Sequence, residues 1–294
     1  MGPVLFNVFL DDIFNFVKEN KLYNYADDNT LSYSRPDLSG LVKSLEKESA
    51  ILIDWFANNK MKANPDKFQA IGDIKFNLDG NEILCENEVK LLRATIDYQL
   101  KFNTHITEIC KKASRQLNVL KRIGKHLSKL GRLTIYHSNI MSNFNYCPVI
   151  WHFCGESNTK KMEKIQERAL RFIYEDFNSD YDTLLLKSGL PSLKIRRLQM
   201  MAIKIFKILH KQSPAYLNDF IRFKHISYFF RWQQTVEIPQ VRTTNFGLHS
   251  LRYAGATLWN ELPDAIGAQT NLNQFKNLIN NWNGNTCRCG SNRS

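Results

Sequence analysis

No stretch of this 294-residue sequence approaches 18 consecutive apolar residues, so no segment is predicted to cross a membrane as a helix. The short apolar run at residues 4–10 has no basic residue before it and is followed by Asp11 and Asp12, unlike a secretory signal peptide. The six cysteines are scattered rather than packed into a disulfide framework. There is no glycine-rich phosphate loop and no serine–histidine nucleophile pattern. These absences favour a protein of the nucleus or cytoplasm that is not secreted.

Acidic residues are scarce after residue 100. Residues 1–100 hold 11 basic and 16 acidic side chains, whereas residues 101–294 hold 29 basic and 12 acidic ones, for a net charge of +12 overall. The apolar fraction of 43% and the charged fraction of 23% are those of a globular protein. The asymmetry favours a part that handles metal or nucleotide beside a part that binds a polyanion; a merely soluble basic surface is the alternative.

Hydrophobic spacing predicts a mixed α+β region over residues 1–100 and helices beyond it. In the first region we expect a hairpin at 22–34, an amphipathic helix over 38–56 capped by Asp37, a strand at 68–71, a second hairpin at 74–84 and a strand at 89–96. In the second region, helical spacing recurs at 106–123, 130–140, 162–173 and 198–209, and a last helix is expected at 275–282.

The sharpest chemical feature is the sequence Tyr25-Ala26-Asp27-Asp28 at the turn of the first expected hairpin. Two adjacent carboxylates repel each other unless a cation or water separates them. Mg²⁺ prefers carboxylate oxygens together with substrate phosphates, and two-metal phosphoryl transfer needs such carboxylates held rigidly. The turn therefore indicates a candidate metal site, with a plain solvated turn as the alternative.

Blocks of sequence around this turn resemble, in order and spacing, the reverse transcriptase of non-LTR (LINE-type, jockey-like) retrotransposons. The four blocks are residues 2–12, Tyr25-Ala26-Asp27-Asp28, Asn64-Pro65-Asp66-Lys67 and residues 91–97. The resemblance covers essentially the whole chain, because residues 146–151, 166–173 and 259–263 resemble the region that follows the polymerase domain in that family.

This resemblance implies an α+β fold in which a partial polymerase palm of antiparallel strands and helices precedes a mainly helical thumb and C-terminal region. The expected domains are the palm at 1–100, a basic thumb and connector at 101–222, and a C-terminal region with a frayed tail at 223–294. The implied reaction is RNA-templated DNA synthesis, with Mg²⁺ as cofactor and an RNA template, a DNA primer and deoxynucleoside triphosphates as partners. By resemblance Asp27 binds metal beside Asp28, Tyr25 lies near the primer end, and Lys67 assists the departing pyrophosphate; for Lys67 a solvated turn lysine is an equal alternative.

The sequence also departs from the family. It begins inside the first block, so the family's first catalytic aspartate and its fingers have no counterpart, and we expect an N-terminally truncated fragment that is inactive alone. Arg93 stands where the family usually has glycine, which commonly serves a special backbone shape. Cys287 and Cys289 are too few for a zinc site of their own.

A basic stripe follows the expected palm. Residues 101–132 contain nine basic side chains and a single acid, Glu108. Such a stripe suits phosphate backbones with salt-dependent, mostly sequence-independent affinity, and a solvated helix face is the alternative. The residues proposed to bind nucleic acid here are Lys111, Lys112, Arg115, Lys121, Arg122, Lys125, Lys129 and Arg132.

Other sequence features give weaker evidence of function. Aromatic side chains at Tyr174, Phe177, Trp232 and Trp259 are suited to stacking on bases, but packing in a core is the more common use. His152 near Cys147 and Cys154 is a weak metal signal. Two alternatives to a polymerase fragment stay open: a non-enzymatic protein that binds RNA or RNA–DNA hybrid and derives from a mobile element, and a relic without function.

Overall fold

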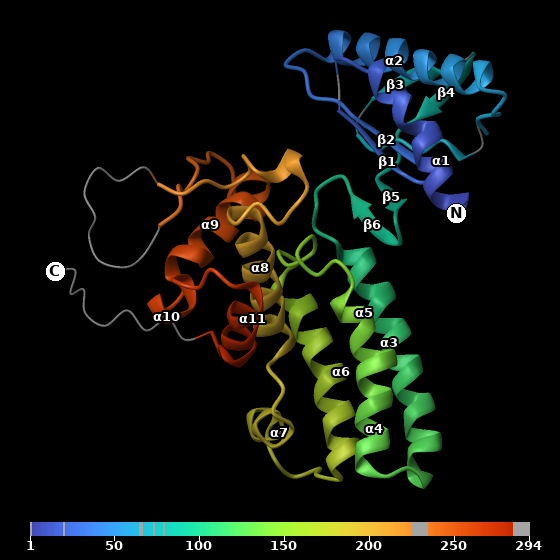
Figure 1. Cartoon of the computed structure of the whole chain (residues 1–294). Helices are drawn as coiled ribbons and strands as arrows, with labels where there is room; N and C mark the ends of the chain where they lie inside the picture. The colour runs from blue at the N-terminus through green and yellow to red at the C-terminus, as the bar shows by residue number, and fades with distance from the viewer. Residues whose placement is uncertain are drawn as a thin grey trace. The chain divides into compact units, whose positions relative to one another are not determined.

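The structure is a computed structural model that describes residues 2–19, 21–64, 67–72, 74–78, 80–224 and 235–284. The chain divides into two compact units, residues 1–91 and 92–294 (Figure 1). The first boundary therefore lies nine residues before the one expected after residue 100. The expected boundary at 222–223 does not separate two compact units, because the helix before it and the helices after it share one core.

The first unit combines helices with two-stranded antiparallel sheets. Its elements are α1 (Gly2–Leu10), the 3₁₀ helix η1 (Asp11–Asn15), β1 (Lys21–Tyr25), β2 (Asp28–Ser32), α2 (Leu38–Asn58), β3 (Lys75–Leu78), β4 (Asn81–Leu84) and β5 (Glu88–Leu91). β1 pairs with β2 and β3 with β4. Both expected hairpins are therefore confirmed, whereas the strand expected at 68–71 is wrong: Ile71 makes only an isolated bridge with Glu86.

α2 organises the first unit. Its N-cap Asp37 accepts a hydrogen bond from the backbone N–H of Gly40 at 2.5 Å, which satisfies one of the orphan donors of the first turn. Leu52 and Trp55 face inward and pack with Leu10 and Ile13 in a small core. Partly buried Leu22 and Leu31, from β1 and β2, cover this core, so the hairpin depends on α2 for its burial.

The second unit begins with β6 (Ala94–Asp97), and its other elements are helical. They are α3 (Asn103–Ile123), η3 (Gly124–His126), α4 (Lys129–Ile135), the π-helical η4 (Tyr136–Met141), α5 (Ser142–Asn145), α6 (Glu156–Tyr174), α7 (Tyr181–Ser188), α8 (Leu193–Leu209), η5 (Ala215–Leu217), η6 (Thr244–Leu248), α9 (Leu251–Glu261), α10 (Asp264–Gly267) and α11 (Leu272–Asn281). The strand expected at 89–96 is in fact two short strands, β5 and β6, with a turn at residues 92–93.

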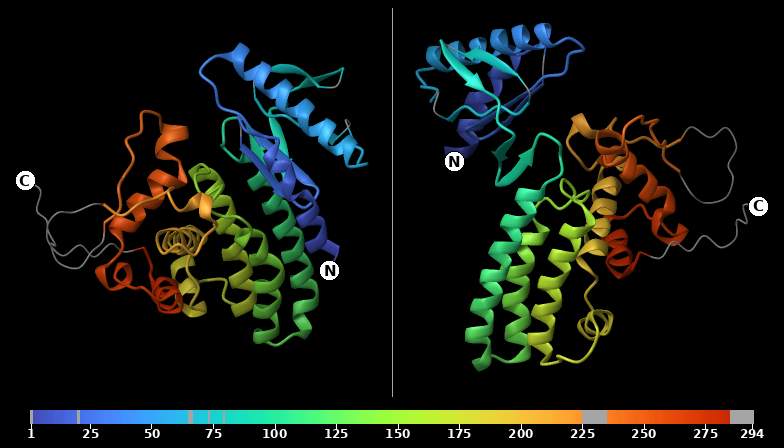
Figure 2. Two further views of the ribbon diagram at one scale, coloured as in Figure 1. Left: turned by 45° about the horizontal axis from the view of Figure 1, so that its top comes forward. Right: turned by 180° about the vertical axis from the view of Figure 1, so that it is seen from behind.

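Two apolar cores hold the second unit together. In the first, α3, the helix from α4 to α5, and α6 run side by side, as both views show (Figures 1 and 2). Buried Tyr136 donates from its hydroxyl to Oε1 of Gln166 at 3.0 Å, so these two polar side chains satisfy each other inside the core. In the second core, α8 packs against α9 and α11, and Phe206 and Phe275 lie with ring centroids 4.4 Å apart.

The protein thus combines helices with small antiparallel sheets, which confirms the α+β class at that level. Nothing in the part of the chain that the structure describes is a helix of sufficient length and apolarity to span a bilayer. Cys287 and Cys289 lie outside the described residues.

Candidate functional site

The Tyr25-Ala26-Asp27-Asp28 sequence forms the tip of the β1–β2 hairpin. Tyr25 lies directly opposite Asp28, and Ala26 and Asp27 make the two-residue turn. Because strand side chains alternate, Tyr25 and Asp28 share one face of the hairpin. This face is turned away from the core, and the side chain of Tyr25 is 68% exposed. The tip therefore presents an aromatic ring and two carboxylates to solvent.

Two asparagines on the opposite face brace the turn. Nδ2 of Asn24 donates to the carbonyl oxygen of Ala26 at 3.0 Å and to Oδ1 of Asn29 at 2.7 Å. Nδ2 of Asn29 in turn donates to the carbonyl oxygen of Asp27 at 3.3 Å. These bonds hold Ala26 in the left-handed region, with φ +53°, which an alanine adopts only at a cost. The strained position lies directly before the two carboxylates, where a fixed backbone positions their side chains.

The other proposed catalytic residue is not joined to this tip. Lys67 is exposed, and its backbone N–H donates to the carbonyl oxygen of Asn64 at 3.1 Å. No ion pair or hydrogen bond links Lys67 to Asp27 or Asp28 within the residues that the structure describes. Over those same residues, no group of three histidine, cysteine, aspartate or glutamate side chains gathers in a way that would hold a metal ion. The tip thus presents two adjacent carboxylates, without a third ligand group from the described residues.

A turn at residues 92–93 interrupts the strand expected at 89–96. Leu92 has φ +44° and Arg93 has φ +68°, so both occupy the left-handed region that glycine tolerates best. The hydroxyl of Tyr146 donates to the carbonyl oxygen of Leu92 at 2.5 Å and ties this turn to the end of α5. This role of Tyr146 has no local signal in the sequence, because the two residues lie 54 positions apart.

Asp97, which belongs to the same sequence block, serves the fold. Its Oδ1 accepts from the backbone N–H groups of Gln99 and Lys101 at 3.1 and 3.0 Å, and its Oδ2 accepts from that of Phe102 at 2.5 Å. The carboxylate thereby orders the chain immediately before α3.

The basic residues of α3 lie on its outward face. Lys111, Arg115 and Arg122 are exposed, while Ala113, Leu117 and Leu120 face the core, as expected from the helical period. The single acid of this segment, Glu108, accepts a hydrogen bond from the hydroxyl of Thr95 at 3.2 Å. Lys112 and Lys125 are also exposed, and Lys121 is half-buried at the flank.

Two basic residues of the stripe make contacts inside the protein. Arg132 donates from Nε to the carbonyl oxygen of Gly124 at 2.8 Å and pairs through Nη1 with Glu175 at 2.6 Å. Its side chain is only 12% exposed, so Arg132 joins α4 to the end of α6 and does not belong to a free phosphate-binding surface. The ammonium of Lys129 lies 4.0 Å from the ring centroid of Tyr174, which occupies that ring in a cation–π contact.

The remaining candidates divide between core and surface. Trp259 is buried in the second core, whereas Phe177 is exposed. Trp232 lies outside the described residues. Burial, aided by Arg197 and Lys194, lowers the pKa of His152 to about 4. His152 is therefore neutral at physiological pH, but it belongs to no three-residue metal-binding group among the residues described.

Comparison with known proteins adds no relative: no family model, no curated protein and no solved structure matches the chain.

Proposed function

We propose that this chain is a segment of an RNA-directed DNA polymerase of the non-LTR retrotransposon type, and that it is inactive alone. Asp27 and Asp28 would contribute carboxylates to a Mg²⁺ centre for phosphoryl transfer, and Tyr25 would contact the primer end. A primer, an RNA template and deoxynucleoside triphosphates would be the partners of the complete enzyme.

The observation that carries the proposal is the exposed Tyr25-Ala26-Asp27-Asp28 tip, which is braced by Asn24 and Asn29. Mg²⁺ keeps several waters and binds through one or two carboxylates plus substrate phosphates. A rigid, solvent-facing carboxylate pair suits this demand, because it leaves coordination positions open for the nucleotide. Among the residues that the structure describes no third carboxylate joins this pair, which is the reason to expect no catalysis by the chain alone.

Mn²⁺ binding to the full chain tests the metal site. Mn²⁺ replaces Mg²⁺ at oxygen ligands and broadens the NMR signals of nearby amides. We expect broadening centred on residues 26–29, reversed by excess Mg²⁺ and lost in Asp27→Asn/Asp28→Asn.

The chain offers a matched control in Asp11 and Asp12, a second adjacent aspartate pair, which lies in η1. Asp11→Asn/Asp12→Asn should leave the broadening at residues 26–29 unchanged. Equal broadening at both pairs would mean that the tip binds Mn²⁺ no more specifically than any other pair of adjacent aspartates. Mg²⁺-dependent primer extension by the chain, abolished in Asp27→Ala, would contradict the expected inactivity.

A second candidate function is non-enzymatic binding of RNA or RNA–DNA hybrid. It is favoured by the outward row of Lys111, Arg115 and Arg122, whose segment contains one acid that is already hydrogen-bonded. The test is the salt dependence of binding to a 20-base-pair RNA–DNA hybrid, measured by fluorescence anisotropy. Neutralising all three residues to glutamine should reduce the slope of log K against log salt by about 2.7, at about 0.9 per phosphate contact. An unchanged slope would mean that the row is a solvated face.

A further inference from the structure

The exposed charges of α6 are segregated by sign. Lys161, Lys164 and Arg168 are exposed and make no ion pair with an acid among the described residues. Lys161 donates a long hydrogen bond of 3.4 Å from its Nζ to Oδ1 of Asn158. Lys160, by contrast, is paired with Glu156 at 3.2 Å.

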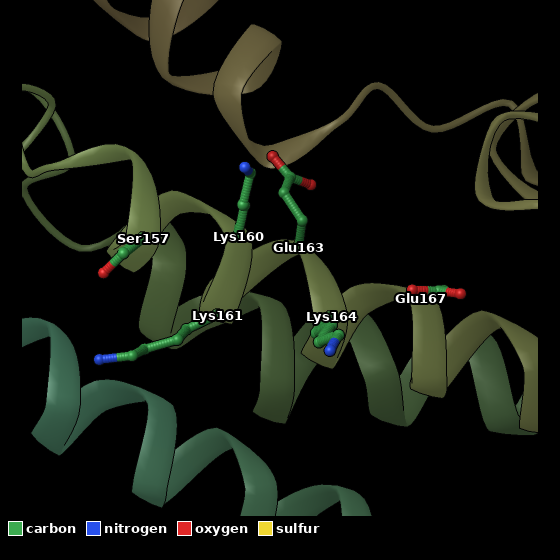
Figure 3. A pocket seen from close by; sticks show the side chains of 6 residues that line it. All are labelled: Ser157, Lys160, Lys161, Glu163, Lys164 and Glu167. Carbon is green, nitrogen blue, oxygen red and sulfur yellow. The ribbon is translucent and has the colours of Figure 1, made fainter.

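The acids on the other flank of α6 are occupied. Oε2 of Glu163 accepts from the hydroxyl of Tyr181 at 2.6 Å and from the backbone N–H of Leu193 at 3.0 Å, so this carboxylate holds α7 and the start of α8. Glu167 pairs with Arg171 at 2.8 Å. A shallow depression of about 360 Å³ lies over this helix and is lined by both kinds of charge. Figure 3 shows Lys161 extending away from Glu163 and Lys160, toward the side of α3.

α3 and α6 lie side by side with a defined register. Nδ2 of Asn158 donates to Oδ1 of Asn103 at 2.7 Å, which sets the first turn of α6 level with the first turn of α3. Both views show the two helices continuing in the same direction from there (Figures 1 and 2). At equal rise per residue, Lys161 and Arg168 lie level with residues 106 and 113 of α3. The Lys161 ammonium also acts electrostatically on the thiol of Cys110, where it opposes the rise in pKa that burial causes.

We infer that Lys161, Lys164 and Arg168 extend the basic row of α3 into a single two-helix surface that binds the sugar-phosphate backbone of a nucleic acid. This inference rests on the second candidate function above and adds to it a contact that the sequence stripe at 101–132 does not contain. Packed helices lie about 8–10 Å apart, so cations on neighbouring helices are close enough for one duplex to contact both. Exposed cations on both helices fit a polyanion that crosses them, and phosphate contacts of this kind are insensitive to base sequence.

The test uses the full chain and the same 20-base-pair RNA–DNA hybrid. Lys161→Gln/Arg168→Gln should weaken binding about tenfold at 100 mM KCl and reduce the salt slope by about 1.8, corresponding to two lost phosphate contacts. The matched control is Arg242→Gln/Arg252→Gln, which removes two exposed cations located outside α3 and α6. It should leave the slope within about 0.3 of the parent value. Unchanged far-UV circular dichroism verifies that each variant is folded.

The outcomes separate this inference from the function on which it rests. If the α3 triple variant flattens the slope and the α6 variant does not, nucleic-acid binding stands and the two-helix surface is overturned. If the parent chain does not bind the hybrid at all, the second candidate function itself fails. Equal losses in the α6 variant and in the Arg242/Arg252 control would also overturn the inference, because net charge alone would then explain binding. If phosphatidylserine vesicles displace the hybrid, and the α6 variant loses vesicle binding equally, the assignment to nucleic acid is overturned.

Discussion

The candidate sites of the two units differ in the secondary structure that carries them and in the size of the core behind it. In the first unit, two acidic side chains stand at the tip of a two-stranded hairpin that is backed by a small core around Trp55. In the second, basic side chains line helices that share a much larger core, which includes Trp151. The sign of the charge differs as well, since acids outnumber bases before residue 100 and bases dominate after it.

The difference concerns how much each site depends on its unit. An isolated two-stranded hairpin is marginally stable, so the acidic tip keeps its shape only through α2 and the asparagine bonds at its turn. The basic row on α3 lies outside a closely packed bundle, and its side chains can change without loss of the helix. Variants at the tip should therefore mix folding with function, whereas variants on the helix faces should separate them.

The largest loss of stability is expected from removing the central tryptophan of each unit's core. Trp151 is fully buried and donates from Nε1 to the carbonyl oxygen of Tyr146 at 3.2 Å, and Trp55 is the largest side chain in the core of the first unit. Trp151→Ala and Trp55→Ala should each cost about 3–5 kcal/mol of unfolding free energy, but each in its own unit. Hydrogen exchange read by mass spectrometry checks this by element. Faster exchange in α3 and α6 caused by Trp55→Ala would mean that the two units unfold as one.

A pH effect centred on His152 is expected in the second unit. Nδ1 of His152 is buried and has no hydrogen-bond partner among the described residues, and burial lowers the pKa of His152 from 6.5 to about 4. Below pH 6.5 the unfolded chain binds a proton here that the folded protein does not, so stability falls as the pH falls. The loss should reach about 2 kcal/mol between pH 7.5 and pH 5.

Urea unfolding of the second unit at these two pH values measures this loss. His152→Asn should remove most of the dependence, and His126→Asn, which changes an exposed histidine, should not. Equal pH dependence in the parent and in His152→Asn would assign the effect to other groups.

The first unit was predictable where local signals were strong. Alternating residues around an Asp-Asp-Asn turn predicted the β1–β2 hairpin, and the capped apolar stripe predicted α2. The strand expected at 68–71 failed because the segment pairs only through the isolated bridge between Ile71 and Glu86, and β-propensity without a longer pairing ladder does not make a strand. The turn at Leu92 and Arg93 was missed within an apparently continuous strand, because neither residue is a usual turn former.

The basic surface was only half predictable, because its members meet through long-range packing. The period of α3 placed Lys111 and Arg115 outward correctly. No local signal joins Asn158 to Asn103, so the addition of α6 required the structure. For the same reason the sequence could not show that Arg132 reaches Glu175, 43 residues away.

Because Arg132 makes internal contacts and Arg122 is exposed, variants of these two arginines should separate an effect on folding stability from an effect on nucleic-acid binding. Arg132→Gln removes bonds to Gly124 and Glu175 and should cost about 1.5 kcal/mol of unfolding free energy with little change in affinity for the hybrid. Arg122→Gln should do the reverse: stability within about 0.5 kcal/mol of the parent and a salt slope lower by about 0.9. Denaturant titrations and anisotropy on the same two variants measure both quantities. If Arg132→Gln lost affinity for the hybrid but kept its full stability, Arg132 would be a contact for nucleic acid rather than a structural residue.

The smallest expected effect lies at the acidic tip. Ala26 has φ +53°, and glycine adopts this backbone without the steric cost that an alanine carries. Part of that gain is offset by the greater freedom of glycine in the unfolded chain, so Ala26→Gly should stabilise the first unit by about 0.5 kcal/mol. Ala50→Gly, on the exposed face of α2, is the matched change and should cost about 1 kcal/mol. Hydrogen exchange of the β1–β2 amides compares the two. If both variants speed exchange equally, the left-handed turn is not the resting shape of the tip, and the carboxylates of Asp27 and Asp28 are not held ready for a cation.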